Sequence, residues 1–374
     1  MLSLRTSLAA AVTLLVAAQT VGADTITLVD GRKIADVTIQ SEELAVVRYR
    51  QRNDREEVPT HQVLRIEYDR LPQAIDEADA LVAEGQVEQA LVELGYYVDA
   101  SLSTNPDKRF PWGPAAAAKR AVEINASSNK LAATQAAASD LIARFPESRH
   151  VPDAYLAKAE AQVQSGDRES ARATLTGLTE LAKSRGLSDR YTLAAQVELA
   201  AIDGDRSGAK RIEALEQLEA QAGSTYPTVR DRALVAQGEV YLELANANPA
   251  ERAAHLDSAR TVFEQALESD GALPATRAGA TVGLGDCNFL PASVANDAAG
   301  LQRAQMLYLR VVVLYGDEAR YASKATFHAG SCFLQLADLN QDEQAKARGR
   351  RMMREVQRRY PDSVWADEAK RYVR

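Results

Sequence analysis

The order of apolar and polar residues along the chain changes once, about seventy residues from its start. The first part has the period of two that is typical of strands, with Ile26 and Leu28 alternating with threonines. Asp30-Gly31 supplies a hairpin turn. This pattern predicts four or five short strands over residues 24–70, arranged most economically as a small curled sheet or a small β-barrel.

Beyond these strands the period becomes helical and stays so to the end of the chain. Gly and Pro fall mostly between the helical stretches, in short turns such as Asp270-Gly271. The segment 104–114 contains three prolines and is expected to be a longer connection. We expect its aromatic residues, Phe110 and Trp112, to pack onto a neighbouring helix.

Small residues recur at matched offsets in the helical part, residues 71–374. Each is followed four positions later by a large apolar residue and three positions after that by a further apolar residue, all on one helical face. These repeats begin at Ala90, Ala138, Ala171, Ala259, Ala304 and Gly349. A second small residue lies upstream on the expected partner helix, at Ala78, Ala159, Gly238, Gly285 and Gly330. Small residues let two helices approach, so the pattern predicts a mostly α fold of stacked antiparallel hairpins, with a degenerate copy around 211–218.

This spacing resembles the tetratricopeptide repeat, in which a small residue on one helix faces an A-x3-F-x2-A signature on the next. Ala259, Phe263 and Ala266 match that signature residue for residue. The resemblance implies an α-solenoid of helix hairpins with a concave groove that binds other proteins. The strands that precede it resemble SH3-like or Sm-like small barrels by pattern alone.

A second motif joins an aromatic residue to Pro, an acid and Ser. It occurs at 145–148 and 360–363, and Tyr226-Pro227 begins a weaker copy. The aromatic residue should pack under the end of one helix, and Ser or the acid should cap the next. The motif resembles bacterial envelope repeat proteins, such as the periplasmic partner of the Tol–Pal system and outer-membrane assembly lipoproteins.

Residues 1–23 have the pattern of a cleavable secretory signal. Arg5 gives a positive start, and the apolar run from Leu8 to Ala18 is too short to span a bilayer. Small residues suit cleavage after Ala23, with Ala18 as an alternative. No cysteine follows the apolar run, so we expect no lipid anchor and a mature protein that is periplasmic or secreted.

The formal net charge is −8, from 52 Asp and Glu against 44 Lys and Arg. Such a chain binds phosphate backbones poorly, so nucleic acid is not an expected partner. The four histidines form no H-E-x-x-H pair, and the chain has no G-x-S-x-G elbow or phosphate-binding loop. We therefore expect a protein that is not an enzyme, with no catalytic residues, no metal site and no cofactor.

Cys287 and Cys332 occupy equivalent positions, each two residues after a repeat glycine. An exported protein can form a disulfide between them. Helix axes 8–10 Å apart favour two buried free thiols instead, because a bridge needs Cα atoms within about 7 Å. His328 shares a helical face with Cys332, but three ligands without regular spacing do not predict a metal site.

Alignment of the repeats on their small residues places eight side chains on the inner groove. They are Glu160, Glu239, Glu243, Asp286, Phe289, Lys324, Phe327 and Gln335. Their acidic bias and two aromatic rings would suit a basic or extended peptide, although plain solvation of a curved surface explains any single one equally well.

These patterns lead to three hypotheses. The first is a non-enzymatic scaffold of the bacterial cell envelope that binds partner proteins or peptides in the concave groove. The alternative is a factor that binds or processes cell-wall glycans and uses the repeats as a framework. In the third, the protein is purely structural and the N-terminal strands drive self-assembly.

Overall fold

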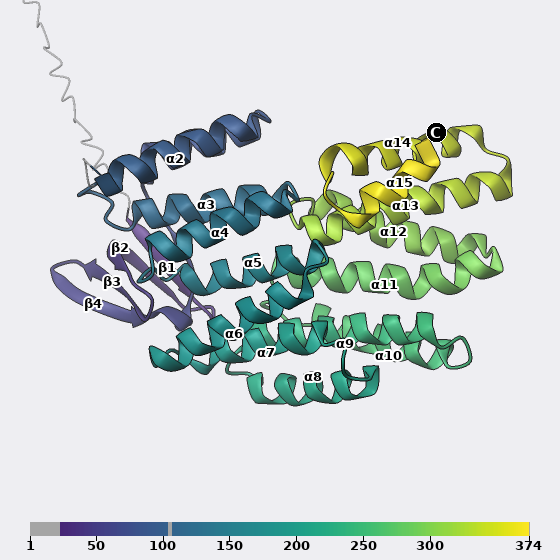
Figure 1. Ribbon diagram of the computed structural model, residues 1–374, viewed down its shortest axis with the longest axis horizontal. Helices are drawn as coiled ribbons and strands as arrows, with labels where there is room; N and C mark the ends of the chain where they lie inside the picture. Colours follow the sequence, from purple (N-terminus) through teal and green to yellow (C-terminus); the bar gives the residue numbers. More distant parts are fainter. Residues whose placement is uncertain (1–22, 104–106, 374) are drawn as a thin grey trace, which may run out of the picture.

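The computed structural model describes residues 23–103 and 107–373 (Figure 1). The strands are β1 (Asp24–Leu28), β2 (Lys33–Glu42), β3 (Val46–Gln51), β4 (Asp54–Pro59) and β5 (Val63–Glu67). The first helices are α1 (Gln73–Ala83), α2 (Val87–Ser103), α3 (Gly113–Ser127), α4 (Leu131–Arg144), α5 (Val151–Gln164), α6 (Arg168–Ser184), α7 (Asp189–Ile202) and α8 (Gly208–Ala222). The remaining helices are α9 (Pro227–Ala247), α10 (Arg252–Leu267), α11 (Pro274–Ala295), α12 (Ala298–Leu314), α13 (Ala319–Asn340), α14 (Glu343–Arg359) and α15 (Val364–Val373).

The fold is therefore mostly α, with helices packed in consecutive pairs after an N-terminal sheet. The expected secretory signal lies outside the described residues, except for Ala23. Within the described ranges, no helix combines the length and the apolar character that a membrane span requires.

The five strands form one antiparallel sheet in the order β4-β3-β2-β1-β5. The sheet does not close, because β4 and β5 are its two edges, so of the two predicted arrangements it is the open sheet and not the barrel. Its apolar face is covered from outside the sheet. Trp112, just before α3, is buried in the apolar cluster of the sheet with Ile26 and Val47.

The connection before α3 thus packs differently from the prediction. Trp112 stacks on Tyr68 with ring centroids 4.1 Å apart, and Phe110 meets Trp112 edge-on at 5.6 Å. These rings lie against the sheet rather than on a neighbouring helix. A sheet whose apolar face is covered in this way has no need to wrap around on itself.

The small residues of the repeat face neighbouring helices, as predicted. The alanines at these positions are at most 2% exposed. A Cβ atom at Gly238 would lie 2.4 Å from the Phe263 ring, and one at Gly285 would lie 2.6 Å from Tyr308. Gly238 thus faces a ring of α10 from α9, and Gly285 faces a ring of α12 from α11. In each pair the absence of a side chain on glycine permits the close approach of the two helices. The degenerate copy corresponds to α8, which has a buried apolar face of its own.

Aromatic residues end three of the described helices in one backbone conformation. Phe145, Tyr315 and Tyr360 follow α4, α12 and α14, with φ between −133° and −129°. Tyr226 has a φ of −129° as well, but it stands directly before α9, since Gly223 is the residue that caps the end of α8. Ser363 accepts a hydrogen bond from the Ala366 N–H at 3.1 Å and so caps α15, as the motif predicted. The copy at Tyr315 escaped the sequence pattern because Gly, and not Pro, follows it.

The curvature of the array brings its late helices back to its early ones. The Leu131 N–H, at the start of α4, donates to Asp362 Oδ2 at 3.2 Å, across 231 positions of sequence. Figure 1 shows the yellow C-terminal helices beside the ends of α3 and α4. The first helices of successive hairpins therefore surround a common interior.

Candidate functional site

A cavity of about 690 Å³ lies inside the curve of the array; we call it the inner cavity. Most of its wall comes from α5, α7, α9, α11 and α13, the first helices of successive hairpins. Its volume falls in the range typical of ligand-binding pockets, about 300–1,000 Å³. The repeat pattern creates it, because one helix of each hairpin faces inward and the other covers it from outside.

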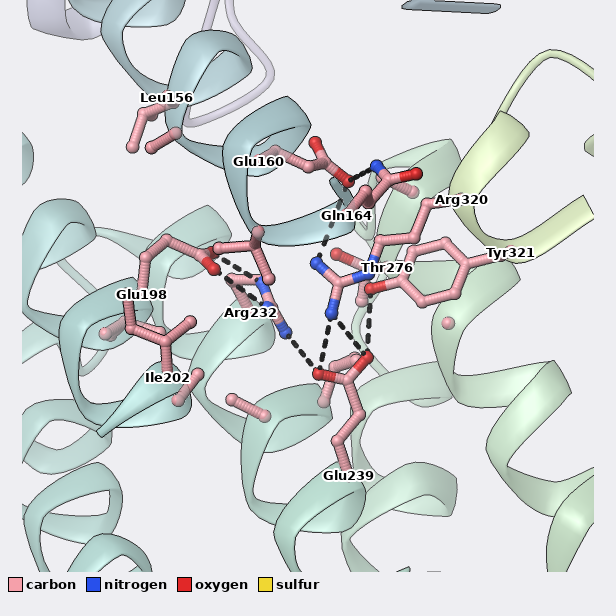
Figure 2. A pocket seen from close by; sticks show the side chains of 18 of the residues that line it. Leu156, Glu160, Gln164, Glu198, Ile202, Arg232, Glu239, Thr276, Arg320 and Tyr321 are labelled. Atoms are coloured by element: carbon pink, nitrogen blue, oxygen red, sulfur yellow. Dashed lines mark hydrogen bonds and ion pairs between the residues drawn. The ribbon is translucent and has the colours of Figure 1, made fainter. Parts of the chain in front are cut away.

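A row of alternating charges crosses the inner cavity (Figure 2). Arg232 donates to both carboxylate oxygens of Glu198, at 2.6 and 2.9 Å. Glu239 lies between two guanidinium groups, 3.4 Å from Arg232 Nη1 and 3.1 Å from Arg320 Nη2. The row ends at Glu160, whose Oε1 is 3.7 Å from Arg320 Nη1. We call these five residues, supplied by α5, α7, α9 and α13, the ion-pair row.

The electrostatics keep the middle of the row charged. Burial alone would raise the pKa of Glu239, but Arg320 and Arg232 outweigh it and hold that pKa below its ordinary value. The Tyr321 hydroxyl also lies 3.4 Å from Glu239 Oε1. Glu239 is thus an ionised acceptor of several hydrogen bonds, and it ties α9 to α13 across the cavity.

Glu318, at the start of α13, behaves in the opposite way. Burial, together with the nearby carboxylates of Glu160 and Asp317, raises its pKa to about 7. Glu318 lines the inner cavity next to the last member of the ion-pair row. It is therefore a carboxyl group that is only half ionised near neutral pH.

A second polar group lines the end of the cavity towards the C-terminus. Lys324 Nζ lies 2.5 Å from Asp286 Oδ2, and the Tyr308 hydroxyl donates to Asp286 Oδ1 at 2.7 Å. The same ammonium group lies 5.9 Å from the centre of the Trp365 ring. Trp365 in turn packs on His328, whose pKa burial lowers to about 4.

The structure brings together five of the eight side chains expected on the groove. Those that line the inner cavity are Glu160, Glu239, Glu243, Asp286 and Lys324.

The other three lie elsewhere. Phe289 packs edge-on against Tyr308, at 6.3 Å between ring centroids. Phe327 is buried among the residues that join α13 to α14 and α15. Gln335 is half-buried further along α13, outside the lining of the cavity. The aromatic character expected of the groove therefore comes from Tyr191, Tyr321 and Trp365 instead.

The sequence reasoning missed the cations of the ion-pair row. Arg232 and Glu239 are seven residues apart and so share a face of α9, which is a signal that the sequence contains. Arg320 offers no such signal, since its partners Glu160 and Glu239 are 160 and 81 positions away. Their approach depends on the curvature of the whole array.

Cys287 and Cys332 are free, buried thiols in the structure and do not form the disulfide that was considered. Burial raises the pKa of each thiol to about 12, so little reactive thiolate forms near neutral pH. Within residues 23–103 and 107–373, no group of three or more His, Cys, Asp or Glu side chains is arranged to hold a metal ion.

A different charged cluster lies where the sheet meets the helices; we call it the junction network. Glu42, at the end of β2, accepts hydrogen bonds from the Arg149 guanidinium and the Tyr68 hydroxyl. Backbone hydrogen bonds surround it, since the Leu44 N–H donates to the Glu147 carbonyl at 2.6 Å. The network fastens the sheet to the connection between α4 and α5.

His150 completes the junction network. Its Nε2 is 3.6 Å from Glu42 Oε2, and neither ring nitrogen has a hydrogen-bond partner among the described residues. Burial, reinforced by Arg149 and Lys119, lowers the pKa of His150 well below its ordinary value. The ring is therefore neutral at physiological pH.

Comparison with known proteins adds no family: no protein-family model matches the chain, and no curated protein matches it.

Proposed function

We propose that this chain is a non-enzymatic scaffold of the tetratricopeptide type, which holds a segment of a partner protein in the inner cavity. The observation that carries the proposal is the inner cavity itself, which the first helices of successive hairpins enclose. Solenoids of this kind bind along the inner side of their curve, because each hairpin is buried only against its neighbours.

The composition of the wall supports binding rather than catalysis. Among the described residues that line the inner cavity there is no Ser, Cys or His, the side chains most often used as nucleophile or general base. The lining carboxylates that would remain as acids or bases are mostly engaged by Arg or Lys.

A place in the bacterial cell envelope is part of the same proposal. It rests on the secretory pattern of residues 1–23 and on the aromatic-Pro-acid-Ser motif, which resembles envelope repeat proteins. The small-to-bulky contacts between Gly238 and Phe263 and between Gly285 and Tyr308 support the tetratricopeptide assignment.

Photo-crosslinking from inside and outside the array tests the proposal. A benzoylphenylalanine at Gln164, in the wall of the cavity, should give one discrete adduct with another protein in cells that make the full chain. The matched position is Gln265, which is exposed on the outer helix α10 and should not give that adduct. Identical adducts from both positions, or none from Gln164, would contradict the proposal.

Cell-wall glycan remains the rival ligand, and one feature of the cavity favours it. Tyr191, Tyr321 and Trp365 line the cavity together with carboxylates, and sugar-binding sites combine the same groups. Sedimentation of the full chain with purified peptidoglycan tests this rival. Cosedimentation that the change Trp365→Ala abolishes would replace the protein partner by a glycan.

A further inference from the structure

Four of the six Arg and Lys side chains that line the inner cavity are paired with carboxylates, whereas Arg190 donates to the His61 carbonyl and Arg168 has no carboxylate partner among the described residues. Arg232 and Arg320 belong to the ion-pair row, and Lys324 is paired with Asp286. Arg211 lies 2.6 Å from Glu243 and also donates to the carbonyl groups at the end of α7. At these four paired cations an anionic ligand would have to displace an internal carboxylate and leave it unpaired, which is costly in a partly buried site.

Glu160 and Glu318 are among the lining carboxylates left without comparable partners, as is Asp153. Glu160 has only the 3.7 Å contact with Arg320 and an amide contact from Gln164 at 3.4 Å, and its side chain is 46% exposed. Glu318 has no hydrogen bond or ion pair from its carboxylate among the described residues. The two are close enough for Glu160 to raise the pKa of Glu318. One further positive charge between them would complete the alternation of the row.

Aliphatic side chains lie beside Glu160 and Glu318 in the wall of the inner cavity. Leu156 and Ala157 lie one turn before Glu160 on α5 and line the same cavity, and Leu273 lines it from the start of α11. A Lys or Arg side chain has an apolar stem and a charged head, and it is most stable where both are accommodated. The wall therefore offers apolar surface next to unsatisfied negative charge.

On the basis of the proposed function, we infer that the inner cavity takes a Lys or Arg side chain of the partner segment, with its charged head between Glu160 and Glu318 and its stem against Leu156. This gives the partner a stated chemistry: an extended segment with a basic residue among apolar ones. Charge complementarity supplies the specificity, because a neutral or acidic side chain would leave two carboxylates facing each other.

Three capped peptides that differ at one position test the inference with the full chain. The probes are acetyl-Ala-Leu-X-Leu-Ala-amide with X as lysine, norleucine or glutamate, carrying a fluorophore for anisotropy. We expect the lysine peptide to bind at least about tenfold more tightly than the other two, which corresponds to about 1.4 kcal/mol. Equal binding of the lysine and norleucine peptides, or no binding of any peptide, would overturn the inference.

Matched variants locate the effect in the cavity. Glu318→Gln and Glu160→Gln should each remove most of the preference for lysine. Glu264→Gln makes the same charge change on the exposed face of α10 and should leave the preference intact. Equal losses in all three variants would mean that net charge alone attracts the peptide, which contradicts the inference.

The pH dependence provides a further readout. A bound cation favours ionised Glu318, so the lysine peptide should bind up to about tenfold more tightly at pH 8 than at pH 6. Glu318→Gln should flatten this profile. The charged groups that act on Glu318 are Glu160 and Asp317, which in turn contact Arg320 and Arg359, and all four are of types that ordinarily titrate outside this range.

Failure of the inference can be told apart from failure of the proposed function. A discrete adduct from Gln164 together with no preference for lysine would keep the scaffold and discard the basic side chain. Absence of an adduct from Gln164 would remove the scaffold itself, whatever the peptides do.

Discussion

Two regions of the molecule bury charged side chains, the junction network and the ion-pair row, and they differ in how far solvent can reach those side chains. In the junction network the Glu42 side chain is 2% exposed and that of Arg149 is 14% exposed, and backbone hydrogen bonds close around them. In the ion-pair row the side chains of Arg232, Glu239 and Arg320 remain 21–28% exposed along the wall of a cavity. Water or a ligand can reach the second set and not the first.

The difference indicates which network is structural and which is available for recognition. The junction network joins two parts of the fold, and its carboxylate has all its strong donors in place. The ion-pair row ends in carboxylates that lack such donors, next to open space. A buried pair that is complete holds parts together, whereas a row with an unmatched end can be completed by a partner.

The largest expected effect is at the junction. Glu42→Gln leaves the Arg149 guanidinium buried without a countercharge, which typically costs about 3–5 kcal/mol. We expect a loss of that size in the free energy of unfolding, measured by urea denaturation and followed by circular dichroism. A loss below about 1 kcal/mol would show that the junction is open to water and would remove the contrast between the two networks.

The next effect concerns the packing behind the cavity wall. Gly238→Ala places a Cβ atom 2.4 Å from the Phe263 ring, so the ring or one of the two helices must shift. Such overpacking costs about 1–3 kcal/mol. Gly95→Ala is the control, since nothing lies within 4 Å of its Cβ position and alanine favours a helix by up to about 1 kcal/mol. Equal changes in the urea midpoint would contradict the close approach of α9 and α10.

These contrasts also explain how far the sequence predicts the molecule. Contacts between neighbouring helices, such as that of Gly238 with Phe263, could be predicted from the sequence because both residues lie within one hairpin. The strands were predicted too, but the sequence left the choice between an open sheet and a barrel undecided, and it did not predict that Trp112 covers the sheet from a later segment. The sequence predicted only part of the ion-pair row. Glu239 and Glu160 were expected on the groove, whereas the position of Arg320 beside them depends on the curvature of the whole array.

A smaller effect is expected inside the cavity. Glu239→Gln removes the central carboxylate, but Arg232 keeps Glu198 and Arg320 keeps Glu160, and solvent reaches both guanidinium groups. We expect a loss of about 2 kcal/mol, clearly less than for Glu42→Gln under the same conditions. A loss as large as that at the junction would mean that the row is as structural as the junction network.

The smallest expected effect has the opposite sign. The pKa of Glu318 is raised from 4.5 to about 7, so between these values the folded state keeps a proton that the unfolded state releases. Stability therefore falls as the pH rises through this window. The full shift would correspond to about 3 kcal/mol, and the solvent that reaches this half-buried group reduces it to about 1 kcal/mol.

Glu318→Gln removes this penalty, because an amide needs no proton to stay neutral. The variant should be more stable than the unmodified chain by about 1 kcal/mol at pH 8 and equally stable at pH 4, as measured by urea denaturation at both pH values. Glu264→Gln, an exposed carboxylate on α10, should change stability at neither pH. A gain for Glu318→Gln that is independent of pH would mean that the pKa of Glu318 is not raised in the folded protein. The inner cavity would then lack the unmatched group that sets it apart.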